Sequence, residues 1–181
     1  MIKKVEPERI TIINRGKPLR LLGCVFYGDP FHSVGGWSEE NEIGLTWQRF
    51  MRLYEKHKAF IQQFCMKCEV MYEVHLEPEE YKNTKKFYVF TGIEITDSPE
   101  IPLELFNMTL PVSKYGIFTF KGENIFRGGE FIYNEWLPDS NYEEAHPFLI
   151  QAYDQRFKGM ESSLLEESEL DYHIPIKLKV Y

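Results

Sequence analysis

The sequence predicts an α+β fold, in which antiparallel strands form one curved sheet with two helices on a single face. The prediction rests on two observations. The order strand, helix, strand, strand occurs twice along the 181 residues, although the two copies share no clear sequence identity. Hydrophobic residues make up 43% of the chain, which is enough to build a core. We therefore expect a single domain over residues 1–181, with two halves at about 8–97 and 103–180.

The first half opens with two strands and a long helix. β-Branched side chains dominate residues 9–14 (RITIIN), and residues 19–27 (LRLLGCVFY) resume the strand pattern after a turn. A helix is predicted over about 41–63, because apolar side chains follow there at steps of three and four residues. Ser38 or Asn41 can cap this helix at its N-terminus.

Two further strands complete the first half. Residues 69–76 (EVMYEVHL) alternate in polarity, so that Met71, Glu73 and His75 point to one face of the strand. Residues 87–96 (FYVFTGIEIT) form the second strand of this hairpin.

A segment rich in turn residues, 97–102 (DSPEIP), separates the two halves. The second half then repeats the order of the first. Its predicted elements are strands over 106–110 and 114–121, a helix over 123–137, and strands over 148–154 and 169–180.

Charge and composition exclude several classes of protein. The formal net charge is −7 and no basic recognition helix is visible, so we predict no direct contact with nucleic acid. The chain has no run of about 18 apolar residues and no apolar secretory segment at its N-terminus, so we predict no membrane contact. Three cysteines, an odd number, do not suit a disulfide framework and favour a reducing cytoplasm.

No metal site, cofactor or catalytic motif is predicted. Residues 65–68 (CMKC) form a single CxxC pair, whereas zinc would need two more ligands at a suitable spacing. The pair follows the predicted helix C-terminus, where the helix dipole has the wrong sign for activating a thiol. The five histidines are scattered, and no HExxH motif occurs.

Several motifs, taken as a set, resemble one known family. They are YEVHL, YVFTGIEI, YGIFTFKG, NEWLPDSNYE, IQAYDQRF and SELDYHIPIK. From about residue 8 to about residue 178 the chain is similar to the GyrI-like small-molecule-binding domain, which is the effector-binding domain of AraC-type and MerR-type multidrug-responsive regulators. The resemblance implies two βαββ units related by a pseudo-twofold axis, with a central ligand cleft. It also implies lipophilic, often cationic, aromatic ligands that meet a buried glutamate among aromatic rings.

The chain departs from the family pattern in two ways. Much of the family has a glutamate where this chain has Gln151, and a neutral amide cannot supply the charge that selects a cation. Glu73, on the matching strand of the first half, is the candidate to replace that charge. The effector module begins almost at Met1, so the resemblance implies a stand-alone form that, as a regulator, acts through another protein.

Glu73 is the first candidate for binding a ligand. A carboxylate on an otherwise apolar strand costs free energy unless it is paired or solvated. In an aromatic cleft it would hold a cation with the help of the ring faces. If it were desolvated, its pKa would rise and it could serve as a general base. The alternative is a glutamate at an open rim, paired with a lysine.

Seven other candidates for the ligand site are aromatic or amide side chains: Tyr27, Trp37, Phe118, Tyr133, Trp136, Gln151 and Tyr153. By helical spacing Tyr133 and Trp136 belong to the core, and the resemblance brings one of them toward the cleft. Gln151 and Tyr153 share one strand face and offer neutral hydrogen bonds and a ring. Trp37 lies on a glycine-containing loop, where it either covers a pocket or anchors the loop.

Three functions are compatible with these residues. The favoured one is a stand-alone module that binds lipophilic, cationic, aromatic small molecules and is linked to transcriptional regulation. The second is a small-molecule hydrolase in the same cleft, with Glu73 or Tyr153 activating water. The third is a protein-interaction inhibitor, as the family's gyrase-inhibitor name suggests, whose acidic surface mimics DNA.

Overall fold

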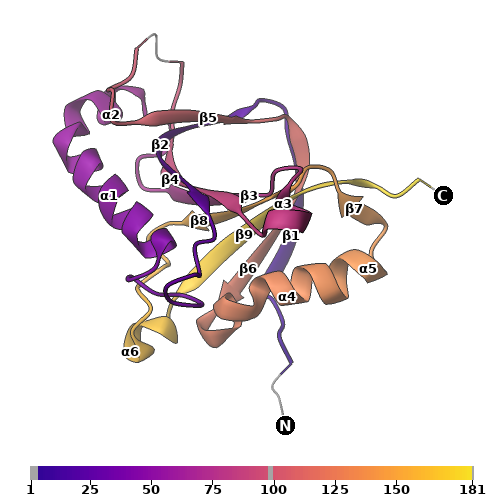
Figure 1. Cartoon of the computed structure of the whole chain (residues 1–181). Helices are drawn as coiled ribbons and strands as arrows, with labels where there is room; N and C mark the ends of the chain where they lie inside the picture. The colour runs from indigo at the N-terminus through magenta and orange to yellow at the C-terminus, as the bar shows by residue number, and fades with distance from the viewer. Residues whose placement is uncertain (1–3, 98–99, 181) are drawn as a thin grey trace. The chain divides into compact units, whose positions relative to one another are not determined.

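The computed structural model describes residues 4–97 and 100–180, and these divide into two compact units (Figure 1). We call residues 18–111 the central unit, and residues 4–17 together with 112–180 the terminal unit. Within each unit the strands pair antiparallel and helices accompany them. The predicted α+β class is therefore confirmed.

The central unit is a four-stranded sheet with helices between its first and second strands in the sequence. The strands pair in the order β3, β4, β2, β5. Its elements are β2 (Leu19–Gly28), α1 (Glu42–Lys56), α2 (Lys58–Phe64), β3 (Met71–Leu76), α3 (Tyr81–Thr84), β4 (Phe87–Glu94) and β5 (Phe106–Leu110).

The long helix predicted over 41–63 is two helices that meet at His57. This residue has φ −109° and ψ 20°, outside the α-helical region, so α1 ends there and α2 begins. Asn41 is the N-cap of α1, because its side chain accepts hydrogen bonds from the backbone N–H groups of Ile43 and Gly44. The structure thus selects Asn41 over Ser38 as the cap.

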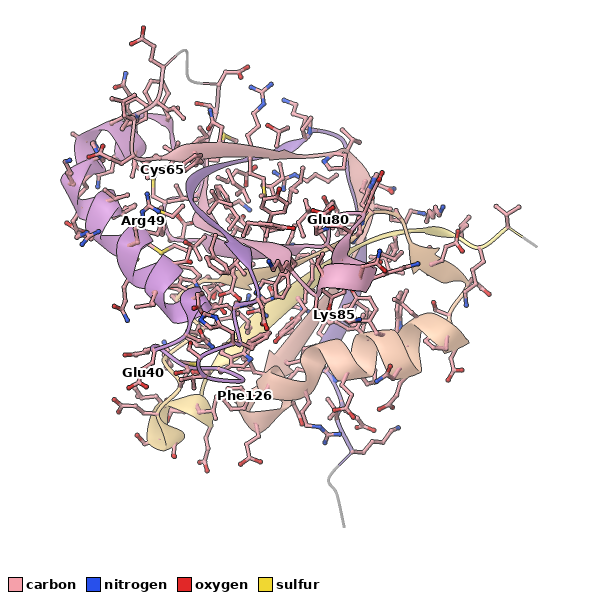
Figure 2. All side chains as sticks on the ribbon, viewed as in Figure 1. Glu40, Arg49, Cys65, Glu80, Lys85 and Phe126 are labelled. Carbon is pink, nitrogen blue, oxygen red and sulfur yellow. A yellow bond between two sulfur atoms is a disulfide. The ribbon has the colours of Figure 1, made fainter. Side chains whose placement is uncertain are left out.

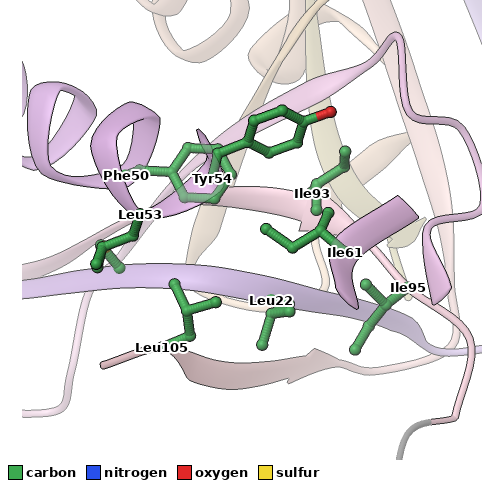
Figure 3. Close-up of a cluster of buried hydrophobic side chains, with 9 residues drawn as sticks. Leu22, Phe50, Leu53, Tyr54, Ile61, Ile93, Ile95 and Leu105 are labelled. Carbon is green, nitrogen blue, oxygen red and sulfur yellow. The ribbon is translucent and has the colours of Figure 1, made fainter. Parts of the chain in front are cut away.

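A hydrophobic cluster joins α1 and α2 to one face of the central sheet (Figure 3). Phe50 and Ile61 of the helices, and Leu22 and Ile93 of the strands, are fully removed from solvent. Burying each such side chain contributes roughly 1.5–3 kcal/mol. The buried members of the cluster are Leu22, Cys24, Phe50, Leu53, Tyr54, Ile61, Ile93, Ile95 and Leu105.

The terminal unit repeats the same strand order. Its sheet runs β1, β6, β9, β8, and β7 pairs with the last part of β9. Its elements are β1 (Arg9–Arg15), β6 (Ser113–Lys121), η1 (Gly122–Arg127), α4 (Gly128–Phe131), η2 (Ile132–Trp136), α5 (Leu137–Asp139), β7 (Tyr142–Glu144), β8 (Phe148–Tyr153), α6 (Ser162–Leu165) and β9 (Glu169–Leu178).

Two strands, β1 and β5, pair with strands outside the halves to which we assigned them. We expected 9–14 in the first half, yet β1 pairs with β6 of the terminal unit, with Ile10 opposite Phe118. We expected 106–110 in the second half, yet β5 pairs with β2 of the central unit. Antiparallel partners need not be neighbours in the sequence, which is why element order alone does not fix these pairings. Residues 98 and 99 of the predicted boundary lie outside the described residues.

The second predicted helix, over 123–137, is a succession of tighter and wider helical turns. It begins as the 3₁₀ turn η1, continues through α4, widens to the π-type turn η2 and ends in α5. Figure 1 draws α4 and α5 as parts of one coiled ribbon. At the start of α4 the helix lies close to β6, because a Cβ on Gly128 would come within 2.7 Å of the Phe120 ring. Glycine at position 128 therefore permits this close packing.

Candidate functional site

Glu73 lies on the helix-facing side of the central sheet. In β3 it stands opposite Thr91 of β4, and Thr91 in turn stands opposite Cys24 of β2, which belongs to the hydrophobic cluster. The Thr91 hydroxyl donates a hydrogen bond of 3.3 Å to the backbone carbonyl of Thr46 in α1. Glu73 is therefore held between its strand and α1, and only 4% of its surface is exposed.

Two side chains bind the carboxylate of Glu73. Trp47 of α1 donates its indole N–H to Oε2 at 2.5 Å, and the Nε2 atom of His75 lies 2.7 Å from Oε1. Both carboxylate oxygens thus have a partner, as a buried carboxylate requires. The pair with His75 is an ion pair only when the imidazole is protonated. The alternative of a glutamate at an open rim does not fit this burial.

Aromatic rings continue outward from Glu73. The centroid of the His75 ring lies 5.3 Å from that of Phe87, which lies 6.3 Å from that of Phe31. Tyr81 meets Phe87 edge-on, with 6.1 Å between the ring centroids. Phe31 is 42% exposed, whereas Phe87 is 9% exposed. We call Glu73, Trp47, His75, Phe87 and Phe31 the Glu73 cluster, in which rings connect a buried charge to the surface.

Tyr27 stands on the other face of the central sheet. In β2 it is opposite Tyr88 of β4, next to the pair Phe26 and Val89, whose side chains face the helices. The ring centroids of Tyr27 and Tyr88 are 4.7 Å apart. Its hydroxyl donates a hydrogen bond of 2.9 Å to Glu80. That hydrogen bond raises the pKa of Tyr27 above its usual value. The structure therefore does not bring Tyr27 together with Glu73.

Trp37 is half-buried in the loop between β2 and α1. Asn41 organises this loop, because its side-chain amide donates to the carbonyls of Val34 (3.3 Å) and Gly36 (2.8 Å). The same loop carries Phe31, the outermost member of the Glu73 cluster. Phe31 is an aromatic residue of this loop whose ring lies beside Phe87.

Gln151 occupies the corresponding place in the terminal unit. It lies in β8 opposite Tyr172 of β9, and only 5% of its surface is exposed. Its side-chain oxygen accepts a hydrogen bond of 2.7 Å from the hydroxyl of Tyr153. The structure thus brings these two predicted residues together. Tyr153 also packs edge-on against Phe157, at 4.9 Å between centroids.

The two units make these positions equivalent. Glu73 lies on β3 and Gln151 on β8, strands that follow the helical segments of their units, although the short strand β7 comes before β8. Each of the two residues shares a sheet face with the side chains that pack under the helix. In the central unit the row across the sheet is Glu73, Thr91, Cys24, and in the terminal unit it is Gln151, Tyr172, Phe118. The large rings of Tyr172 and Phe118 therefore occupy the row beside Gln151. The row beside Glu73 holds the small side chains of Thr91 and Cys24, and Trp47 of α1 binds Glu73 there.

Phe118 and Trp136 pack against each other in the terminal unit, whereas Tyr133 lies at its surface. Phe118 is fully buried, and its ring centroid lies 4.8 Å from that of Trp136. Trp136 also stacks on Tyr142 at 6.0 Å, with only 7° between the ring planes. Tyr133 is 39% exposed and donates its hydroxyl to Glu144 at 2.8 Å.

Sequence reasoning missed four residues of the Glu73 cluster: Trp47, His75, Phe87 and Phe31. Trp47 is one of the apolar side chains in the helix predicted over 41–63, and a buried indole also needs an acceptor for its N–H. His75 was counted among scattered histidines, although alternation along the strand puts it on the same face as Glu73. Both features were therefore present in the sequence pattern.

Neither a metal site nor a membrane-crossing helix occurs in the described parts of the chain. Across residues 4–97 and 100–180, no three His, Cys, Asp or Glu side chains are grouped so that they could hold a metal ion. Over the same residues, no helix combines the length and the apolar character that crossing a membrane requires.

A family model confirms the class of protein that the fold and the buried charge suggest, a small-molecule effector-binding domain. Residues 21–176 match the model described as Cass2, integron-associated effector binding protein. The chain therefore belongs to the Cass2 family, which agrees with the predicted GyrI-like resemblance.

One sequence relative is the transcriptional regulator BrlR of Pseudomonas aeruginosa. The two are 28% identical over 147 residues, which are 78% of this chain and 48% of BrlR. The chain thus spans about half the length of this curated relative.

Solved structures share the fold at low sequence identity. The integron cassette protein VCH_CASS2 from the mobile metagenome of Vibrio cholerae is 15% identical, with a TM-score of 0.59 over 94% of this chain and 97% of that one. SAV2435, solved bound to tetraphenylphosphonium, is 14% identical, with a TM-score of 0.67 over 93% of this chain and 94% of that one. The C-terminal domain of EcmrR is 11% identical, with a TM-score of 0.60 over 94% and 97% of the two chains.

Proposed function

We propose that this chain is an effector-binding module for lipophilic, cationic, aromatic small molecules, and that Glu73 selects the charge of the ligand. The observation that carries the proposal is the Glu73 cluster. A carboxylate with 4% exposure is held there by Trp47 and His75, and the rings of Phe87 and Phe31 lead from it to the surface.

The physical argument concerns the cost of a buried charge. A carboxylate loses most of its hydration in such a place, and hydrogen bonds from neutral donors offset only part of that loss. An organic cation supplies the missing opposite charge, and ring faces attract it further. A strongly hydrated cation would lose its own water on entry, so the argument favours a large cation with its charge spread over rings.

Two comparisons support the same ligand class. The family is described as effector-binding, and tetraphenylphosphonium, which is bound in the structure of SAV2435, is a lipophilic aromatic cation. The relative BrlR is a transcriptional regulator, so we also propose that effector binding by this chain serves transcriptional control. The contribution of Gln151, Tyr153, Trp136, Tyr133, Phe118, Tyr27 and Trp37 to ligand binding stays a prediction.

A pair of dyes tests the charge argument. Rhodamine 6G is a cation and Nile red is neutral, and fluorescence polarisation gives a Kd for each. Glu73→Gln should weaken rhodamine 6G by about tenfold or more, which corresponds to about 1.4 kcal/mol, and should change Nile red much less. Chromatography of the dyes after incubation should recover both unchanged, which separates a binder from a hydrolase.

Glu80→Gln is the matched control, because Glu80 is an exposed glutamate of the same unit. Its carboxylate accepts a hydrogen bond from the Tyr27 hydroxyl. It removes the same charge and should leave both dyes bound as before. An equal loss of both dyes in the Glu73→Gln variant would show that Glu73 does not select charge.

A further inference from the structure

Cys65 and Cys68 are joined by a disulfide, with their Cα atoms 5.5 Å apart. This differs from the prediction that three cysteines do not suit a disulfide framework, because an odd count leaves room for one local pair beside a free cysteine. The remaining cysteine, Cys24, is free and fully buried in the central unit.

Backbone hydrogen bonds hold Cys65 at the end of α2. Its N–H donates to the carbonyl of Ile61 at 2.8 Å, and it forms an isolated bridge with Ile95 just after β4. On either side, the N–H of Met66 donates to Glu94 at 2.9 Å, and the N–H of Thr96 donates to Phe64 at 2.8 Å. The position of Cys65 is thus set by backbone contacts that do not involve its sulfur.

Cys68 is the more accessible of the two. It lies in the turn that leads to β3, where the N–H of Val70 donates to Lys67 at 3.1 Å. Residues 66–69 are exposed, whereas Cys65 is half-buried. Cys65, labelled in Figure 2, packs against the hydrophobic cluster. A small thiol can therefore reach the sulfur of Cys68 without any part of the core opening.

We propose that Cys65 and Cys68 are a reversible redox site that exchanges with low-molecular-weight thiols and disulfides of the glutathione class. In the oxidising direction the Cys68 thiolate attacks a sulfur of the small disulfide and releases one small thiol. The Cys65 thiolate then attacks Cys68 Sγ in this mixed disulfide and releases the second small thiol. Two cysteine thiols are thereby oxidised to one disulfide, and one small disulfide is reduced to two thiols.

The local fold favours this pairing over others. A sequence separation of three residues keeps the two cysteines close, and the backbone contacts that hold Cys65 do not involve its sulfur. Cys24 cannot compete, since it is fully buried and burial raises the pKa of its thiol. The proposal is independent of the ligand that the module binds.

Peptide mapping of the whole chain tests the proposal directly, because Lys67 lies between the two cysteines. The folded protein is equilibrated with either oxidised glutathione or dithiothreitol, free thiols are alkylated in denaturant, and trypsin is added. After oxidised glutathione we expect peptides 59–67 and 68–82 to be recovered as one disulfide-linked species. After dithiothreitol both should appear separately and alkylated.

Opposite outcomes would overturn the proposal. It fails if peptides 59–67 and 68–82 stay separate and alkylated after oxidised glutathione. It also fails if either cysteine links instead to Cys24 or to a second chain.

Melting temperature gives an independent readout, with Cys68→Ser as the control variant. Reduction should lower the Tm of the wild-type protein by about 2–6 °C, because a short closed loop constrains the unfolded chain only modestly. The Tm of Cys68→Ser should not respond to reduction. An equal response of wild type and variant would show that the effect of reduction arises elsewhere.

Discussion

At the scale of single residues, the buried polar side chains of the central unit each have a defined set of partners. Glu73 of β3 accepts hydrogen bonds from Trp47 of α1 and from His75 of its own strand. Asn41 makes four hydrogen bonds to backbone groups, two as donor and two as acceptor, and has no exposed surface. Because such side chains have lost their hydration, each is sensitive to the loss of a partner.

Asn41→Ala should lower the free energy of unfolding by about 1–3 kcal/mol. The change removes the cap of α1 and also the two bonds that fix the loop carrying Phe31. Urea unfolding followed by circular dichroism measures the loss. Ser38→Ala is the control, because the Ser38 hydroxyl accepts from the exposed N–H of Glu40, and its loss should change stability by about 0.5 kcal/mol or less. Equal effects of the two variants would contradict the cap assignment.

The sequence made Glu73 predictable but not the way its charge is held. Alternation along 69–76 placed Glu73 and His75 on one face, and the structure confirms that they meet. The indole N–H of Trp47 comes from 26 residues away, and its direction depends on how α1 packs on the sheet. A pattern of apolar spacing records that a helix face is buried, but not which atom of a neighbouring strand it meets.

At the scale of elements, the start of α4 lies against the β6 and β9 strands of the terminal unit. A Cβ on Gly128 would come within 2.7 Å of Phe120 and 3.2 Å of Tyr172, whereas a Cβ on Gly129 would meet no atom within 4 Å. The two neighbouring glycines therefore differ sharply in the space around them.

Gly128→Ala should destabilise the protein by about 1–3 kcal/mol, because the added methyl group overpacks the interface between helix and sheet. Gly129→Ala should be neutral or stabilise by up to about 1 kcal/mol, because alanine favours the helix and the site has room. Chemical denaturation of both variants measures the difference. The packing account fails if Gly128→Ala is the more stable of the two.

The connection between β8 and β9 is held by Arg156. Its guanidinium lies 2.8 Å from Asp154 Oδ2 and 2.6 Å from Asp171 Oδ2. Burial alone would raise the pKa of Asp154, but the hydrogen bonds from Arg156 outweigh it and hold this pKa below its usual value. The hydrogen bonds that Arg156 donates to Asp154 and Asp171 in turn raise the pKa of its guanidinium, which stays charged.

Because the pKa of Asp154 is lower in the folded protein than in the unfolded chain, its contribution to stability is present above about pH 4 and is lost as the pH falls further. We therefore expect the urea midpoint of the wild-type protein to fall between pH 5 and pH 3, with part of that fall absent in Asp154→Asn. Asp139→Asn, at an exposed site at the end of α5, should keep the wild-type profile. If the urea midpoints of all three proteins depended on pH in the same way, the Asp154–Arg156 pair would not contribute to this pH-dependent stability.

Element types were largely predictable, and element boundaries were less so. The strands over 106–110 and 148–154 and the hairpin formed by 69–76 and 87–96 correspond closely to β5, β8, β3 and β4. The break at His57 and the π-type turn η2 were not predicted, because local backbone geometry is set by packing that periodicity does not record. The short elements α3, β7 and α6 were too brief to show a period.

At the scale of the whole molecule, two units with the same strand order arise from sequences without clear identity. The strand–helix–strand–strand repeat was visible in the order of elements. The unit to which β1 and β5 belong could not be predicted from that order. Each of these strands is followed in the sequence by a strand of the other unit. The equivalence of Glu73 and Gln151 follows from the repeat, and it leaves a charged side chain in only one of these two positions.

Titration calorimetry with two ions of nearly the same shape tests the central claim most directly. Tetraphenylphosphonium and tetraphenylborate carry four phenyl rings each and differ in the sign of their charge. We predict that the wild-type protein binds the cation at least about tenfold more tightly than the anion, and that Glu73→Gln abolishes most of this preference. Equal affinity of the wild-type protein for both ions, or an unchanged preference in Glu73→Gln, would contradict the claim that Glu73 selects a cationic ligand.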